Sequence, residues 1–338
     1  MPFPEKSQLR VIPTPGQTVF CLFGVFCLAL LLRNSEIAIE YITTGLRLCA
    51  RTVIPSLFPF MVLSDWILSA GMGGALSRTL TLPLRYLFGL PEAGCYAVLL
   101  GMLCGFPVGA RCAVSAYDRG ELTREDCERV LTFSNVPSSA FLISAVGVSL
   151  WNNRKFGIAL YLTVLSVSVG IGICGNLFRK KKRKSSTLPP PVSRAVPLHL
   201  PAATAFTSSV RAATQSILLV CAYVLFFSAL IGTLGRLFSA LHLSSRTSAV
   251  LFSFFELSGG MAHAAALENT AYAARLCAFG AGWSGLSVHC QVMSVCDGRG
   301  LSFRGYFLSK LVSGVLCVLL FSLLLYLFPA LLIPASGC

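Results

Sequence analysis

The sequence predicts an all-α, polytopic membrane protein, and three observations support this prediction. Hydrophobic residues make up 55% of the 338 residues and charged residues only 12%, and the mean hydropathy is +0.76. Soluble domains carry about 25% charged residues, so this chain has too little polar surface to face water. The same composition excludes a disordered chain and a small disulfide scaffold. Apolar runs recur along the sequence, as the spans of a membrane protein do.

The charge balance also fits a membrane protein. Lys and Arg number 27 and Asp and Glu 13, which gives a formal net charge of +14. In a soluble protein this excess would suggest nucleic-acid binding, but in a membrane protein it indicates basic loops kept on the cytoplasmic side. Six consecutive cations at 179–184 supply much of the excess, so we expect no nucleic-acid partner.

The N-terminal region is predicted to hold two different segments. Residues 1–34 read as a polar tail followed by a first transmembrane span, with the N-terminus in the cytoplasm. Residues 35–53 alternate apolar residues with Glu36, Glu40 and Arg47 at helical spacing, which is typical of an amphipathic interfacial helix.

Two longer regions follow, and they share one order of segments. Each contains a full span, two short apolar segments broken by Gly, Pro or Ser, and a second full span. The shared order predicts two repeats, at 54–178 and 206–335, joined by a basic cytoplasmic linker at 179–205. The spans are at 54–70, 156–178, 216–238 and 306–332. The breaks are at 105–109, 134–139, 256–260 and 280–287.

A charged stretch at 117–129 lies between the two broken segments of the first region. Thr123 is followed three residues later by Asp126, a spacing that resembles a capping box. We therefore expect a helix to begin at this point.

The paired breaks point to a binding site. Backbone amides in hydrocarbon must be hydrogen-bonded, so irregular backbone at membrane depth is tolerated only around a cavity. Secondary transporters place substrates at paired discontinuous helices, whose ends supply positive or negative poles. The alternative is that Gly and Ser at the breaks only permit close helix packing.

Three charged residues stand out near these breaks. Asp65 and Glu256 are carboxylates in otherwise apolar runs, where an acid is costly and by default functional; a structural ion pair is the alternative for both. Arg111 could attract an anionic substrate or extend its charge to the headgroups. Trp283 could stack on a planar ligand or belong to an interfacial belt. The residues predicted to line the substrate site are Gly105, Pro107, Gly109, Arg111, Ser134, Asn135, Ser138, Ser139, Glu256, Ser258, Gly259, Gly260, Trp283 and Ser284.

Signals for catalysis and metal binding are missing from the sequence. The 14 cysteines include no C-x-x-C pair, so we expect packing residues and not a zinc site. His263 and His289 lack an H-E-x-x-H partner, and no nucleophile elbow, P-loop or dinucleotide fingerprint occurs. We therefore expect no enzyme, no metal and no cofactor.

Several motifs resemble a known family. They are Ser56-Leu57-Phe58-Pro59-Phe60, Gly105-Phe106-Pro107-Val108-Gly109-Ala110-Arg111, Phe133-Ser134-Asn135 with Ala145-Val146-Gly147-Val148, and Glu256-Leu257-Ser258-Gly259-Gly260. Together they resemble the sporulation integral membrane proteins with nucleoside recognition, or Gate, domains. The resemblance covers roughly residues 35–335. It departs at Pro137-Ser138-Ser139, where the family pattern is more glycine-rich.

The resemblance implies two Gate-like repeats and a role in spore formation. One group of the family is implicated in moving dipicolinic acid across the outer forespore membrane. We therefore expect a transporter of this small planar anion, in the bacterial cell membrane or the outer forespore membrane. The alternatives are a nucleoside or ion transporter of the same architecture, or a non-transporting scaffold for spore-envelope assembly. The expected partners are the lipid bilayer and a small anionic or planar substrate, while a coupling ion and a homo-oligomer stay open.

Overall fold

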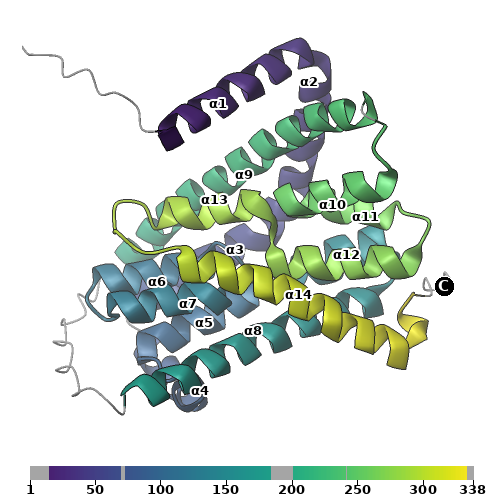
Figure 1. Ribbon diagram of the computed structural model, residues 1–338. Coiled ribbons are helices and arrows are strands. Elements are labelled where there is room, and N and C mark those ends of the chain that lie inside the picture. The colour runs from purple at the N-terminus through teal and green to yellow at the C-terminus, as the bar shows by residue number, and fades with distance from the viewer. Residues whose placement is uncertain (1–14, 70–72, 184–200, 241, 333–338) are drawn as a thin grey trace, which may run out of the picture.

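The computed structural model describes residues 15–69, 73–183, 201–240 and 242–332. Within these ranges the chain is helical and contains no strand, as Figure 1 shows. The all-α prediction is therefore confirmed. The predicted tail at 1–14 and most of the basic linker lie outside the described residues.

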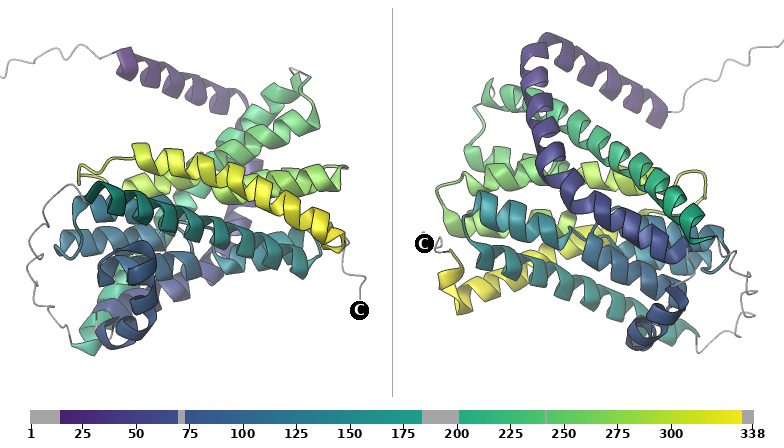
Figure 2. Two further views of the ribbon diagram at one scale, coloured as in Figure 1. Left: turned by 60° about the horizontal axis from the view of Figure 1, so that its bottom comes forward. Right: turned by 180° about the vertical axis from the view of Figure 1, so that it is seen from behind.

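The N-terminal helices form a sharply bent arm. Helix α1 (Pro15–Arg33) meets α2 (Ser35–Leu48) at an angle of 95°. Helix α2 continues through η1 (Cys49–Val53) into α3 (Ile54–Ser69). Figures 1 and 2 show α1 at the edge of the molecule in every view. One face of α2 packs on α9, with Gly45 against Leu225 and Ser228. The range predicted for an amphipathic helix, 35–53, is helical, while its place at the membrane interface stays a prediction.

The first predicted repeat contains one helix that the sequence analysis did not anticipate. Helix α4 contains Pro83 and Arg85. These residues interrupt the apolar pattern, so the helix was not predicted from the sequence. It bends by 102° into α5. Thr123 precedes the first residue of helix α7, and its side chain accepts a hydrogen bond from the Asp126 amide. This confirms the predicted cap. The helices of this region are α4 (Gly73–Phe88), α5 (Glu92–Cys104), α6 (Val108–Asp118), α7 (Arg124–Ser134), η2 (Ala140–Leu150) and α8 (Arg154–Arg183).

The second region repeats the order of short helices. A long helix is followed by four short ones and another long one. These helices are α9 (Ala202–Ala240), α10 (Ser245–Phe255), α11 (Leu257–Ala265), α12 (Thr270–Trp283), α13 (Gly285–Val295) and α14 (Arg304–Leu327), with a final turn η3 (Pro329–Leu332).

Three of the described helices are long and apolar enough to cross a membrane. They are at 154–179, 203–237 and 304–327, and each of the two bent pairs could add one more span. The span predicted at 54–70 corresponds to α3, which has 16 residues with Pro59 inside and contains one of the shorter apolar helices, at 57–67. That it crosses the membrane stays a prediction.

All four predicted breaks are present in the structure. They fall between α5 and α6 (break 1, Gly105–Pro107), between α7 and η2 (break 2, 135–139), between α10 and α11 (break 3, Glu256), and between α12 and α13 (break 4, Ser284). Helix α14 crosses the front of the molecule in Figure 1 and packs on α12, α7 and α8. The division of the chain into two repeats stays a prediction.

Glycines of η2 and α8 pack closely against each other, and this contact can be tested by mutation. A Cβ on Gly157 would lie 2.6 Å from the Leu142 carbonyl oxygen and 2.9 Å from the Gly147 Cα. We expect Gly157→Ala to lower stability by about 1–3 kcal/mol, the usual cost of overpacking. Gly170→Ala on the same helix meets nothing within 4 Å and serves as the matched control. Thermal unfolding in detergent measures both, and equal melting temperatures would contradict the packing.

Candidate functional site

The helix breaks meet around one small cavity. Its volume is about 50 Å³, which is room for one or two waters. Phe106 comes from break 1, Ser138 from break 2 and Glu256 from break 3. Gln291 lines it from α13, the helix that starts at break 4. The cavity therefore brings together segments that are far apart in sequence, from Phe106 to Gln291.

Backbone contacts hold the breaks against one another in pairs. The Phe106 amide donates a hydrogen bond of 3.0 Å to the Val136 carbonyl, so break 1 is tied to break 2. A Cβ on Gly105 would lie 2.6 Å from the Ser138 nitrogen. A Cβ on Gly285 would lie 3.0 Å from the Leu257 nitrogen, so break 4 lies against break 3. Both glycines have positive φ, at +83° and +81°, which favours glycine on conformational grounds as well.

Glu256 caps the helix that it precedes. Its two carboxylate oxygens accept hydrogen bonds from the Ser258 amide at 2.9 Å and the Gly259 amide at 2.5 Å. The side chain is only 4% exposed. A carboxylate at a helix N-terminus is stabilised by the amides and by the helix dipole. Glu256 therefore orders its own break while it lines the cavity.

Arg111 and Asp65 form an ion pair. The Arg111 Nη2 and Asp65 Oδ2 atoms are 2.6 Å apart, and the side chains are 17% and 21% exposed. The pair joins α6 to α3. Arg111 does not line the cavity. Its charge is neutralised by Asp65 within the protein.

Trp283 is buried and already stacked. Its indole nitrogen donates a 2.9 Å hydrogen bond to the Phe254 carbonyl, and its ring stacks on Phe254 with centroids 5.0 Å apart. The His289 ring meets it edge-on at 4.3 Å. The interpretation of Trp283 as part of an interfacial belt is therefore wrong, because the side chain is buried. Phe254 occupies one face of its ring.

Unpaired polar atoms gather at breaks 2 and 4 and along α13. Buried atoms normally have a hydrogen-bond partner, in protein or water, and an exception calls for an explanation. The atoms without a partner in this region are Ser134 Oγ, Asn135 Oδ1, Ser284 Oγ, Ser287 Oγ, His289 Nε2 and Gln291 Oε1. They mark a polar region that is not satisfied by the protein alone.

Lys310 is a buried cation that the sequence analysis missed. It lies on α14, is 2% exposed, and its ammonium donates to the Asn135 carbonyl in break 2. His289 on α13 lies against the same stretch of α14, because its Nδ1 atom is 2.9 Å from the hydroxyl oxygen of Tyr306, one turn before Lys310. The signal was present in the sequence, because Lys310 is a charge inside the apolar run 306–332. It was overlooked because the comparison of isolated charges covered only carboxylates.

The remaining predicted residues shape the backbone at the breaks. A Cβ on Gly109 would lie 2.9 Å from the Gly101 Cα, and Gly260 lies directly against Ser253. Pro107 precedes the first residue of α6. Among the described residues, no group of three His, Cys, Asp or Glu side chains could hold a metal ion. Close packing thus accounts for the two glycines, while the polar residues at the breaks need another explanation.

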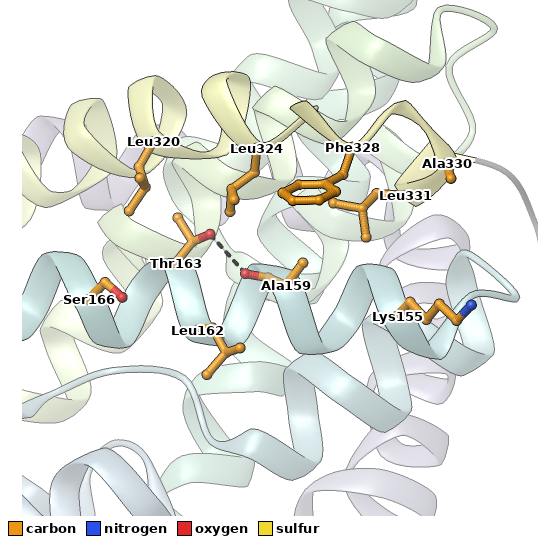
Figure 3. Close-up of a pocket in the computed structure, with 10 residues that line it drawn as sticks. All are labelled: Lys155, Ala159, Leu162, Thr163, Ser166, Leu320, Leu324, Phe328, Ala330 and Leu331. Carbon is orange, nitrogen blue, oxygen red and sulfur yellow. Dashed lines mark hydrogen bonds between the residues drawn. The ribbon is translucent and has the colours of Figure 1, made fainter. Parts of the chain in front are cut away.

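A larger cavity lies between α8 and α14, apart from the breaks. Its volume is about 530 Å³. Figure 3 shows Leu320 and Leu324 from α14, and Phe328 directly after it, facing α8 across the cavity, with Lys155 near one end. The Thr163 hydroxyl donates to the Ala159 carbonyl at 2.8 Å, so its donor is satisfied. The groove is mainly apolar and holds no residue from a break, so the smaller cavity is the candidate site.

Comparison with known proteins supports membrane insertion. The chain is 26% identical over 325 residues to the sporulation integral membrane protein YlbJ of Bacillus subtilis (strain 168). The alignment covers 87% of this chain and 79% of YlbJ. This chain is an integral membrane protein, since its relative is one and it has helices able to span a bilayer. No family model matches, and no solved structure matches.

The Arg111–Asp65 pair provides a test of the site's framework. Removing one partner of a buried ion pair leaves an unpaired charge, which costs about 3–5 kcal/mol when burial is complete. We expect Asp65→Asn and Arg111→Gln each to lower the melting temperature more than the double variant does. Thermal unfolding of the four proteins measures the coupling. Additive losses would show that the two charges do not stabilise each other.

Proposed function

We propose that the chain is a sporulation-associated membrane transporter of a small planar anion, with dipicolinic acid favoured. One observation carries the proposal: breaks from both halves of the chain line a single cavity that contains Ser138, Glu256 and Gln291. This is the arrangement by which secondary transporters build a substrate site from broken helices. The name of the relative YlbJ supports the link to sporulation.

The substrate would bind where the breaks meet, after the cavity widens. Pockets for small molecules occupy about 300–1,000 Å³, whereas this one occupies about 50 Å³. The structure therefore corresponds to a closed state under this proposal. Alternation between closed and open states is what a transport cycle requires.

Helix ends would supply the first attraction for an anion. Helix α13 has no side-chain cap at its N-terminus, so its amide dipoles are available to a ligand. At the N-terminus of η2 the Ser138 hydroxyl accepts a 3.1 Å hydrogen bond from the Phe141 amide, and a ligand there would compete with this bond. The α11 N-terminus is already neutralised by Glu256. Asn135, Ser138 and Ser284 would orient the substrate through hydrogen bonds. Dipicolinate would move across the outer forespore membrane, from the mother cell towards the forespore, as the family resemblance implies.

Arg111 has a supporting part in this mechanism. Because it pairs with Asp65, it would hold α6, the helix that follows break 1, against α3. Glu256 would keep break 3 in its binding conformation, and no enzymatic step is involved.

A nucleoside transporter of the same architecture is the second candidate. It would use Trp283 to stack a base, but Phe254 occupies one face of that ring. A scaffold without transport activity would tolerate neutral changes at the cavity. Uptake of dipicolinate and of nucleosides into the same vesicles distinguishes these candidates.

Gln291→Leu tests the proposed site. The Gln291 Oε1 atom is buried without a partner, so an apolar residue of similar size should leave stability unchanged or raise it. We expect dipicolinate uptake by proteoliposomes to fall about tenfold or more, as the loss of a substrate hydrogen bond predicts. Gln215→Leu, on an exposed position of α9, is the matched control. Unchanged uptake in both variants would refute this site.

A further inference from the structure

The buried ammonium of Lys310 carries an inference that rests on, and extends, the proposed function. Lys310 is buried on a membrane-spanning helix. The ion pairs of the described residues all involve arginines: Arg111, Arg119, Arg124, Arg129, Arg179 and Arg299. The protein thus gives Lys310 a carbonyl partner and, within the described part of the chain, no carboxylate.

The buried acids of the same region are not available to Lys310. Asp65 is paired with Arg111, and Glu256 is bound to the amides of α11. A buried charge without a counter-ion is expensive, and in membrane segments such charges mark substrate or ion pathways. An anion that enters next to Lys310 would supply the missing counter-charge.

The surroundings of Lys310 suit a carboxylate. An ammonium has three donors, and one of them contacts the Asn135 carbonyl. Ser134 Oγ lacks a partner at the end of α7, and His289 Nε2 lacks one on the neighbouring helix α13. Hydroxyl and imidazole groups can donate to carboxylate oxygens. Lys310 contacts Asn135 directly, and the His289 Nδ1 atom on α13 is 2.9 Å from the hydroxyl oxygen of Tyr306, which lies one helical turn before Lys310 on α14.

A purely structural role for Lys310 is the competing explanation. Its partner carbonyl follows the last residue of α7, and a cation near a helix C-terminus is stabilised by the helix dipole. That role accounts for the position of the charge. It does not account for the unpaired polar atoms on both segments beside it.

We infer that Lys310 is the counter-ion of a substrate carboxylate, held at the end of α7 until the anion arrives between break 2 and α13. The ligand class is a small organic carboxylate. Lys310, and not Arg111, then supplies the positive charge for the anion, because Arg111 is neutralised by Asp65.

The test compares a dianion with a neutral analogue of the same shape. The full chain in proteoliposomes takes up labelled dipicolinate, and unlabelled dipicolinate or pyridine-2,6-dicarboxamide competes. For Lys310→Gln we expect the KM for dipicolinate to rise about tenfold or more, which is the usual effect of losing a charged hydrogen bond. Competition by the neutral diamide should change little, so the preference for the dianion should be lost. Lys310→Arg should retain most of that preference.

Lys155→Gln is the matched control, because Lys155 is an exposed lysine beside the α8–α14 groove. It should behave as the wild type. If Lys310→Gln keeps the wild-type preference for dipicolinate over the diamide, Lys310 only stabilises the end of α7 and the inference is overturned.

A second variant keeps the inference testable if Lys310→Gln does not fold. Asn135→Asp places an internal carboxylate on the residue that Lys310 contacts. Under the inference it abolishes thermal stabilisation by dipicolinate, which a bound ligand otherwise provides; retained stabilisation would overturn the inference. Failure of the proposed function looks different, since wild-type vesicles would then take up no dipicolinate. In that case acetate and benzoate serve as probes, and the inference fails if neither raises the wild-type melting temperature.

Discussion

The structure depends on one constraint: backbone groups at a helix break cannot stay unpaired in hydrocarbon. Four breaks bring eight helix ends into the interior, and each end leaves amides or carbonyls without intrahelical partners. The protein satisfies two of them by tertiary contacts. The Phe106 amide donates to the Val136 carbonyl and so joins break 1 to break 2, and Lys310 donates to the Asn135 carbonyl and so joins break 2 to α14. The need to satisfy these groups therefore holds separate segments together.

Charged side chains also bind unpaired backbone groups at the helix ends. A carboxylate, Glu256, lies at the N-terminus of α11, and an ammonium, Lys310, lies at the C-terminal end of α7. Each charge faces the pole that stabilises it, so they need not pair with each other. At the N-terminus of η2 the Ser138 hydroxyl accepts a hydrogen bond from the Phe141 amide, whereas the N-terminus of α13 has no side-chain cap. The α13 N-terminus is therefore the helix end that can attract an anion.

The sequence predicts the breaks better than the contacts between them. Gly105 and Pro107 are residues that interrupt helices by their own conformational preferences, and Thr123 caps α7 through a local bond. The Asp65–Arg111 pair joins residues 46 positions apart, so only tertiary packing reveals it. The same holds for the stack of Trp283 on Phe254. Helix α4 was not predicted because Pro83 and Arg85 interrupt its apolar pattern. Lys310 was not predicted because, among charges inside apolar runs, only the carboxylates were considered.

Under the proposed transport cycle, the walls of the cavity would differ in how readily they separate. On one side the cavity is lined by residues of breaks 1, 2 and 3; a backbone hydrogen bond joins breaks 1 and 2, and a glycine contact joins breaks 3 and 4. Its other walls are Leu57 of α3 and Val220 and Val224 of α9, which contribute only apolar side chains. Separating apolar side chains within a bilayer exposes no unpaired polar group and loses mainly dispersion contacts, because lipid tails are equally apolar. The α3–α9 wall can therefore leave the breaks at a lower energetic cost than the breaks can leave one another. The Asp65–Arg111 pair, which joins α3 to α6, would act as the pivot of that movement.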